Sequence, residues 1–129
     1  MPATSTTNKS KIVTTRLLEI RTYRLKPGTL EDFHTAVHEK AVPMLKTKGI
    51  DVVAYGRSDH EEETYFLIRS FANRESLERE QAEFYNSKDW KSGPRSELVD
   101  RIETYMNTLI VASESAIASM RDLNQSASH

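Results

Sequence analysis

The segment from Leu17 to Leu25 alternates between apolar and polar side chains, and it constrains the fold more than any other part of the sequence. Because successive side chains of a strand point to opposite faces, a period of two predicts a β-strand with one apolar face. Leu18 and Ile20 form that apolar face. The opposite face carries three side chains with possible chemical roles: Glu19, Arg21 and Tyr23.

A helix is predicted after the Lys26-Pro27-Gly28 turn, with Thr29 in position to cap its N-terminus. Its apolar residues recur at intervals of three and four, which places them on one buried stripe: Leu30, Phe33, Val37, Ala41, Met44 and Leu45. Pro43 lies within this stripe and cannot donate a backbone hydrogen bond, so we expect a kink there. Gly49 is suited to the position that follows the helix.

Shorter patterns predict the remaining elements. Residues 50–56 and 64–71 are predicted strands, and the polar segment 58–63 joins them as a hairpin. Three more elements follow along the chain: a helix capped by Asn73 (73–86), a short helix (95–101) and a last strand (102–112). The resulting order, β-α-β-β-α-(α)-β, is that of ferredoxin-like α+β folds, in which a four-stranded antiparallel sheet carries helices on one face.

The chain has 129 residues, which suffice for one domain and are too few for two independent cores. We expect a disordered arm at 1–15, the folded domain at 16–112 and a tail at 113–129. The arm is rich in Ser and Thr and has no apolar run, so no secretory signal is predicted and a cytoplasmic location is expected. Ile117 and Met120 have helical spacing, which predicts a short helix in the tail.

The composition excludes several classes of partner. The 18 basic residues are balanced by 19 acidic ones, so the positive excess of a nucleic-acid-binding face is missing. No stretch approaches the ~20 apolar residues that span a bilayer. The sequence has no cysteine, which removes disulfides, thiolate nucleophiles and cysteine-ligated metals. No nucleic acid, membrane, metal or cofactor is therefore predicted as a partner.

One face of the predicted sheet lacks a helical cover. Four residues expected on that face are too apolar to be left in water: Tyr23, Tyr55, Leu67 and Phe71. Two copies packed through these faces would bury them, so we expect a homodimer that closes into a dimeric α/β barrel. The interior of such a barrel would shelter a small organic ligand.

Several segments resemble the NIPSNAP family. The run Leu18-Glu19-Ile20-Arg21-Thr22-Tyr23-Arg24-Leu25-Lys26-Pro27-Gly28 is similar to the strand and turn that open its domains. Ala41-Val42-Pro43-Met44-Leu45 resembles the end of the family's first helix, and Asp89-Trp90 resembles an acidic-Trp pair after its second. The resemblance covers about residues 17–112. It implies a dimeric α+β barrel related to antibiotic-biosynthesis monooxygenases and to other cofactor-free or haem-handling barrels, and it implies no particular reaction.

The polar face of the first predicted strand supplies the main candidates for catalysis or ligand contact. Arg21 could hold an anionic or enolate oxygen, Tyr23 could donate a hydrogen bond, and Glu19 could abstract a proton. Alternatively, Glu19 and Arg21 pair with neighbouring strands and fix the register of the sheet or dimer. Arg69 and Arg57 are the candidate partners of Glu19, because a buried arginine without a carboxylate is costly.

The helices and loops supply further candidates. His34 and His38 are four residues apart on one helix, a spacing that metal sites also use, but a solvated pair is the favoured interpretation. His34 is the candidate base at the mouth of the barrel. Tyr55 and Arg69 are candidate ligand contacts, as is Trp90, which could instead anchor its loop.

Three functions are compatible with this sequence. The first is a small enzyme that acts on an aromatic or polyketide-like compound by cofactor-free oxygenation or isomerisation. The second is a non-catalytic binding or dimerisation module, and the third is a haem-binding variant, against which the lack of a clear axial ligand argues. We expect a small organic ligand in a dimeric barrel and leave catalysis open.

Overall fold

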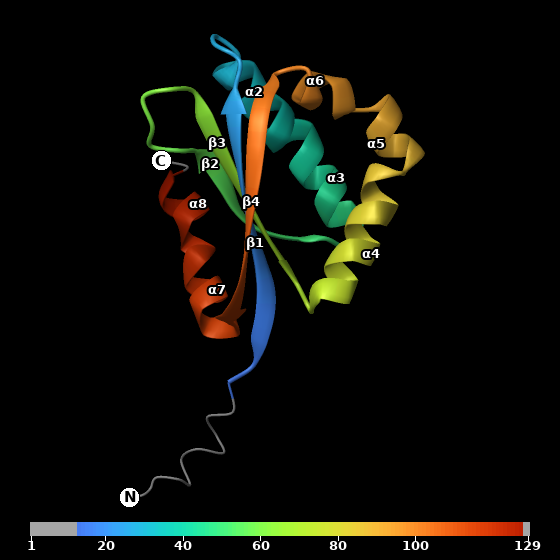
Figure 1. The fold of residues 1–129 in the computed structure, drawn as a ribbon, viewed down its shortest axis with the longest axis vertical. Coiled ribbons are helices and arrows are strands. Elements are labelled where there is room, and N and C mark those ends of the chain that lie inside the picture. The colour runs from blue at the N-terminus through green and yellow to red at the C-terminus, as the bar shows by residue number, and fades with distance from the viewer. Residues whose placement is uncertain (1–12, 128–129) are drawn as a thin grey trace, which may run out of the picture.

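The computed structural model describes residues 13–127 and contains a four-stranded antiparallel sheet (Figure 1). Residues 1–12 of the expected N-terminal arm lie outside the described residues. The elements in chain order are β1 (Thr15–Leu25), α2 (Leu30–Ala36), η1 (Val37–Ala41), α3 (Val42–Thr47), β2 (Asp51–Arg57), β3 (Thr64–Phe71), α4 (Arg74–Tyr85), α5 (Lys88–Ser92), α6 (Arg95–Val99), β4 (Ile102–Ser113), α7 (Glu114–Met120) and α8 (Asp122–Ala127).

The strand order is β2-β3-β1-β4, and all three pairings are antiparallel, so the predicted ferredoxin-like α+β fold is confirmed. The helices from α2 to α6 cover one face of the sheet, which we call the inner face. The last two helices, α7 and α8, lie on the opposite face of the sheet, which we call the outer face (Figure 1). The C-terminal helices therefore cover part of the face that the sequence analysis expected to be bare.

The first helix contains a widened turn immediately before Pro43. Residues Val37–Ala41 form a π-helical turn between α2 and α3, since the proline cannot donate the next backbone bond. Gly49 ends the helix with a φ of 87°, a conformation that favours glycine. The expected kink at Pro43 thus takes the form of a π turn that shifts the register of the helix against the sheet.

The N-terminus of α2 is capped from another part of the chain. The Thr29 side chain makes no capping bond and donates instead to the Lys26 carbonyl, so the predicted cap is wrong. Glu63 replaces it, because its carboxylate accepts the amide protons of Gly28 at 2.6 Å and Leu30 at 2.8 Å. These backbone bonds lower the pKa of Glu63. The acidic hairpin between β2 and β3 therefore anchors the first helix.

Two further helices begin at side-chain caps. Asn73 accepts a hydrogen bond from the Ser76 amide at 2.8 Å, which confirms the predicted start of α4. Ser87 accepts from the Trp90 amide at 3.2 Å and begins the short helix α5, which the sequence analysis did not predict. This helix places the Trp90 side chain in the core beside α4.

The assignment of faces made from the sequence is wrong for β1. Leu18 packs beneath α7 with Ile68 and Ile117, on the outer face. Glu19, Arg21 and Tyr23 point toward the helices α2–α6 rather than into a space between two sheets. Tyr55, Leu67 and Phe71 were expected on the bare face and lie on this helix-covered face too. An alternating pattern identifies two faces but does not say which one receives the helices.

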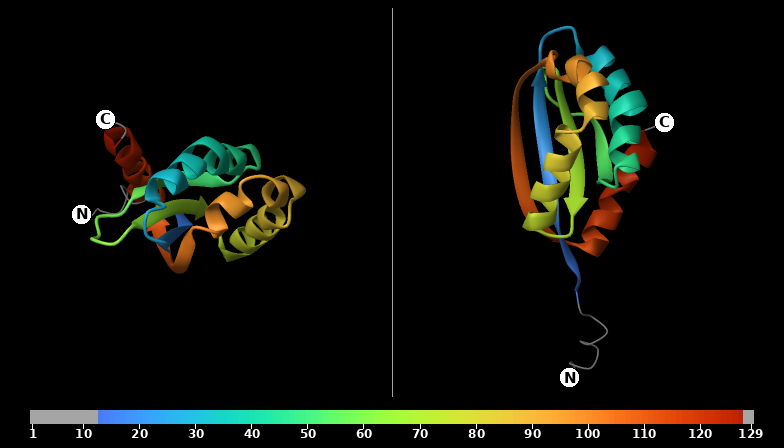
Figure 2. Two further views of the ribbon diagram at one scale, coloured as in Figure 1. Left: turned by 90° about the horizontal axis from the view of Figure 1, so that it is seen from above. Right: turned by 90° about the vertical axis from the view of Figure 1, so that its right-hand side faces the viewer.

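The two edges of the sheet differ in their protection. At the β2 edge, the Asn124 side chain on α8 accepts from the Tyr55 amide at 2.8 Å and donates to the Tyr55 carbonyl. Arg121 adds a bidentate pair with Asp51, with N–O distances of 2.9 and 2.7 Å. The β4 edge lies at the outside of the molecule, and none of the helices within residues 13–127 lies beyond it (Figure 2). Among residues 13–127, no helix is long and apolar enough to cross a membrane.

Candidate ligand-binding site

A cavity of about 790 Å³ lies between the inner face of the sheet and the helices. Its wall combines four aromatic side chains with seven aliphatic ones: Phe33, Tyr65, Phe84 and Trp90, and Val37, Ala41, Leu45, Leu67, Leu98, Val99 and Ile102. Its polar lining comes from β1 and α4: Arg21, Tyr23, Gln81 and Tyr85. The rim includes Arg95 and Glu103. Both the volume and the mixture of an apolar wall with a few convergent polar groups are typical of small-molecule sites.

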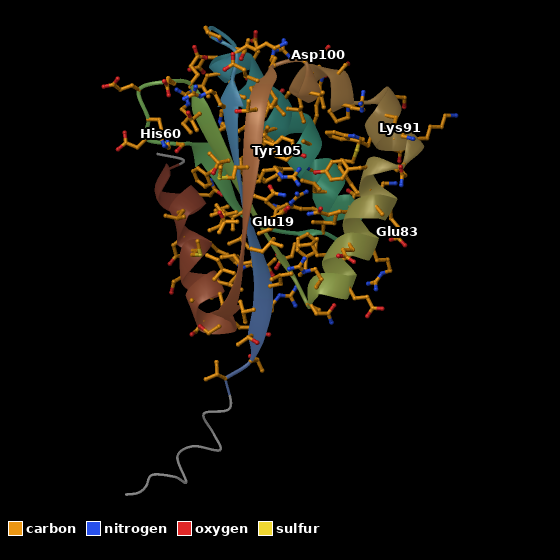
Figure 3. The ribbon with its side chains drawn as sticks, in the orientation of Figure 1. Glu19, His60, Glu83, Lys91, Asp100 and Tyr105 are labelled. Carbon is orange, nitrogen blue, oxygen red and sulfur yellow. The ribbon has the colours of Figure 1, made fainter. Side chains whose placement is uncertain are left out.

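A buried ion pair supports the polar end of this cavity. Glu19 and Arg69 face each other across β1 and β3, and Arg69 Nε donates to Glu19 Oε1 at 2.8 Å. Gln81 Nε2 lies 3.0 Å from both carboxylate oxygens. Figure 3 shows Glu19 among the side chains enclosed between strands and helices. The sequence analysis offered Arg69 or Arg57 as the partner, and the structure identifies Arg69.

Arg69 is held by two further contacts. Its Nη2 lies 2.7 Å from Glu19 Oε1, although among the described residues it makes no aligned hydrogen bond. Its Nη1 donates to the Tyr85 hydroxyl at 2.8 Å. Burial opposes the charge of Arg69, but the interactions with Tyr85 and Glu19 outweigh burial and raise its pKa. Arg69 therefore stays protonated and orients both Glu19 and Tyr85.

Arg21 is the second cation at the polar end of the cavity. Its Nη2 reaches Glu19 Oε2 at 3.2 Å, and its Nε donates to Asn107 Oδ1 at 2.7 Å. Its guanidinium carbon lies 5.0 Å from the centre of the Tyr105 ring. Two guanidiniums thus share one carboxylate, which leaves a surplus of positive charge at this end of the cavity.

Tyr23 lines the cavity beside Arg21. Burial raises the pKa of its hydroxyl to about 12, and the proximity of Tyr85 adds to this effect, whereas Arg21 and Arg69 oppose it. The hydroxyl is therefore neutral at physiological pH and can donate a hydrogen bond. Together, these side chains can bind and polarise an oxygen acceptor in the cavity.

The candidate histidines lie at a different end of the layer. His34 Nδ1 is 2.6 Å from the Tyr65 hydroxyl, and His38 Nδ1 is 2.5 Å from the Tyr55 hydroxyl. Burial lowers the pKa of His34, and the positive charges of Arg57 and His38 lower it further. Neither histidine lines the cavity, and neither does Tyr55, so His34 and Tyr55 lie outside this candidate site. Within the described residues, no group of three acidic or histidine side chains could hold a metal ion.

The predicted site residues therefore separate into three groups. Arg21, Tyr23 and Trp90 line the cavity. Glu19 and Arg69 lie beneath its polar lining as a pair, and His34 and Tyr55 lie apart from it.

The sequence analysis missed two polar residues on α4, Gln81 and Tyr85. A signal was present, because Leu77, Gln81 and Tyr85 recur every four residues and so share one face of the helix. Leu77 is buried on this face. A glutamine on this buried face predicts a buried polar partner, because buried polar groups are hydrogen-bonded.

Comparison with known proteins identifies relatives of this fold. A family model described as NIPSNAP matches residues 18–115, and no curated protein matches the chain. A NIPSNAP family protein of unknown function from Agrobacterium tumefaciens is 23% identical, with a TM-score of 0.70 over 76% of this chain and 88% of that one.

Two more distant structures share the fold. A dimeric ferredoxin-like protein from an uncultured marine organism is 16% identical, with a TM-score of 0.56 over 76% of this chain and 88% of that one. A putative antibiotic biosynthesis monooxygenase from Bordetella bronchiseptica is 18% identical, with a TM-score of 0.55 over 75% and 94%. At these identities the likeness shows a common fold, and the function has to be argued from the site.

Proposed function

Because the chain belongs to the NIPSNAP family, in which a relative of solved structure has no known function, we propose a function from the cavity itself. The protein binds a small organic molecule between the inner face of its sheet and the helices α2–α6. The cavity of about 790 Å³ carries this proposal, because a concave, mostly apolar pocket with a few polar groups at one end is the usual form of a small-molecule site. A pocket of this size, with Arg21, Tyr23, Gln81 and Tyr85 grouped at one end, is therefore the expected ligand site.

The aromatic wall supports the proposal. The Trp90 ring lies 5.3 Å from the rings of both Phe84 and Tyr85, so three aromatic side chains from α4 and α5 meet on one side of the cavity. Such rings bury large apolar areas at low entropic cost and are suited to flat, apolar ligands.

The arrangement favours binding over proton abstraction. Glu19 was the candidate base, but Arg69, Gln81 and Arg21 all bond to its carboxylate. Among the described lining residues, Glu103 is the one carboxylate, and it lies on an exposed part of β4. Both oxygens of this carboxylate are already occupied by donors, so the alternative of an isomerase or cofactor-free monooxygenase that uses Glu19 is less well supported.

A fluorescent probe tests the binding proposal. N-phenyl-1-naphthylamine is neutral, and its emission rises in apolar surroundings, so we expect a saturable increase with the wild-type protein. Val99→Trp places a large ring at a cavity-lining position that is 42% exposed, and it should abolish most of this increase. Leu123→Trp on α8, at 47% exposed, is the matched control and should bind as the wild type does. Equal binding by both variants would place the probe elsewhere and contradict the proposal.

We further propose that the protein self-associates through β4 and the adjoining part of the outer face. Met106 and Ile110 lie on that face of β4, and Met106 is 71% exposed. A long apolar edge strand is a surface for pairing with another chain, and the ferredoxin-like relative is described as dimeric. Because α7 and α8 cover the β2 side, the contact is restricted to the β1–β4 side.

Sedimentation velocity tests this association. Ile110→Lys should convert a dimer into a monomer, because it places a charge in the proposed contact, whereas Leu123→Lys on α8 should leave the dimer intact. A wild-type monomer at all concentrations, or a dimer in both variants, would contradict the proposed interface.

A cytoplasmic location stays a prediction from the sequence. It is compatible with the absence of cysteine, which is usual in a reducing compartment. Fractionation of cells that express the tagged chain should recover it with cytoplasmic markers, and recovery with membranes or the medium would contradict the prediction.

A further inference from the structure

We propose that the occupant of this cavity is an anion, namely a ring-bearing apolar molecule with a carboxylate, enolate or phenolate oxygen that Arg21, Tyr23 and Tyr85 bind. This inference rests on the proposed function, since it names the chemical class of the ligand in the same site. Three observations carry it: the charge count at the polar end, the direction of the available hydrogen bonds and the shape of the wall.

The charges at the polar end are not balanced by the protein alone. Glu19 supplies one negative charge, and Arg21 and Arg69, which both contact Glu19, supply two positive ones. Arg69 and Glu19 are fully buried and hold each other at 2.7 Å, so their charges compensate. The charge of Arg21 is the surplus, and Arg21 lines the cavity. The Arg21 side chain is only 13% exposed, so water screens its charge poorly, and an anion is the occupant that compensates this charge.

The hydrogen-bonding groups at this end can act as donors toward a ligand. The Tyr85 oxygen accepts from Arg69 Nη1, which leaves its own proton for another acceptor and polarises the hydroxyl. Tyr23 keeps its proton at physiological pH and lines the same space. Arg21 has more N–H groups than its contacts with Glu19 and Asn107 use. A ligand that presents an oxygen acceptor satisfies all three, whereas a ligand that presents only donors leaves them unpaired.

The rest of the cavity suits an apolar body attached to this oxygen. Phe84 and Trp90 form the wall next to Tyr85, with ring centroids 5.3 Å apart and tilted by 43°. A second aromatic pair, Tyr23 and Phe33, lies 5.5 Å apart and extends the wall from the sheet side. A flat ring system can therefore contact aromatic side chains while its oxygen reaches Arg21.

Two matched probes separate this inference from the proposed function. 2-Naphthoate and 2-naphthamide have the same ring system and nearly the same size, but only the first carries a charge at neutral pH. By isothermal titration calorimetry, we expect 2-naphthoate to bind about tenfold or more tightly, since hydrogen bonds to charged groups are the stronger ones. Equal affinities would overturn the inference and leave the proposed function standing. Binding of neither probe, nor of N-phenyl-1-naphthylamine, would overturn the proposed function.

Variants of Arg21 locate the anion. Arg21→Gln should remove the preference for 2-naphthoate and leave the affinity for 2-naphthamide within about twofold of the wild type. Arg21→Lys keeps the charge and should retain part of the preference. Lys88→Gln is the control for a general effect of positive charge, because Lys88 is an exposed lysine of α5 that does not line the cavity. It should retain the full preference.

Two results would overturn the assignment of Arg21. One is a preference that persists in a folded Arg21→Gln variant, and the other is a preference that disappears in Lys88→Gln. Circular dichroism establishes whether Arg21→Gln folds. If it does not, the wild-type affinities for the acid and the amide still decide whether the ligand is an anion.

Discussion

Two arginine–glutamate pairs in the inner layer have the same length and lie in opposite surroundings. Arg69 and Glu19 are 2.7 Å apart, with their side chains 0% and 1% exposed. Arg57 and Glu31 are also 2.7 Å apart, but their side chains are 50% and 75% exposed. A distance alone therefore says little about what a pair does. The buried pair incurs a large desolvation penalty that packed apolar side chains would avoid, which favours a positioning role over a purely stabilising one.

The regions around these pairs differ in the same way. At the histidine end, the Tyr55 and Tyr65 hydroxyls contact His38 and His34, and neither histidine lines the cavity. At the cavity end, Arg69 directs its donors to Glu19 and Tyr85, and a space remains above them. The Arg69–Glu19 pair is therefore buried next to the proposed ligand site, whereas the Arg57–Glu31 pair, away from the cavity, is exposed to solvent.

The largest contrast is expected between alanine substitutions of the two glutamates. Glu19→Ala leaves Arg69 buried without its carboxylate, so the free energy of unfolding should fall by about 3–5 kcal/mol. Glu31→Ala removes an exposed pair and should cost about 0–1 kcal/mol. Urea denaturation of both variants measures these changes. Similar losses would show that burial does not distinguish the pairs.

A smaller contrast is expected between two hydroxyl deletions. Tyr85→Phe removes the acceptor of the buried, charged Arg69 Nη1 and should cost about 1.5–3 kcal/mol. Tyr65→Phe removes the partner of His34, which is partly accessible to water, and should cost about 0.5–1.5 kcal/mol. The same denaturation experiment gives both values, and a larger loss for Tyr65→Phe would reverse the comparison of the two ends.

The smallest effect concerns pH at the histidine end. The pKa of His34 is below its ordinary value of 6.5 because of burial and the nearby positive charges of Arg57 and His38, which Glu31 opposes in part. As the pH falls, the unfolded chain therefore binds this proton before the folded one does. The stability present above about pH 6.5 should decrease as the pH falls toward the folded-state pKa.

His34→Gln isolates this contribution. Its urea midpoint should fall less than that of the wild type between about pH 7.5 and about pH 5, because the other titrating groups are common to both proteins. The same decrease in both proteins would show that His34 carries no part of the pH dependence.

The sequence predicts the elements of this fold better than it predicts their packing. Alternation in β1 and the cap at Asn73 are local signals, and the structure confirms both elements. The side of the sheet that receives the helices is a tertiary property, and Glu19 and Arg21 on the polar face of β1 gave no sign that this face is buried. Glu19 is buried because Arg69 lies opposite it on β3, 50 residues away in the sequence. No local pattern encodes such a pairing.

The candidate site was predicted only in part for a related reason. Arg21 and Tyr23 were predicted from the alternation of β1, a local pattern that places both side chains on one face of the strand. Gln81 and Tyr85 come from α4, and the packing of that helix over β1 and β3 brings them to the cavity. His34 is a candidate because of its chemistry, but it contacts the Tyr65 hydroxyl and does not itself line the cavity. Residue types identify candidate site residues, and tertiary packing determines which of them lie together at the cavity.

Amide chemical shifts upon addition of 2-naphthoate test most directly whether the cavity end is the ligand site. In ¹H–¹⁵N spectra of the assigned protein, the account predicts saturable shifts for the amides of Arg21, Tyr23 and Tyr85. The indole N–H of Trp90, the one tryptophan in the sequence, should shift as well. The amides of Tyr55 and Arg57, which do not line the cavity, should stay in place. Shifts centred on the histidine end, or no shifts at saturating probe, would contradict the account.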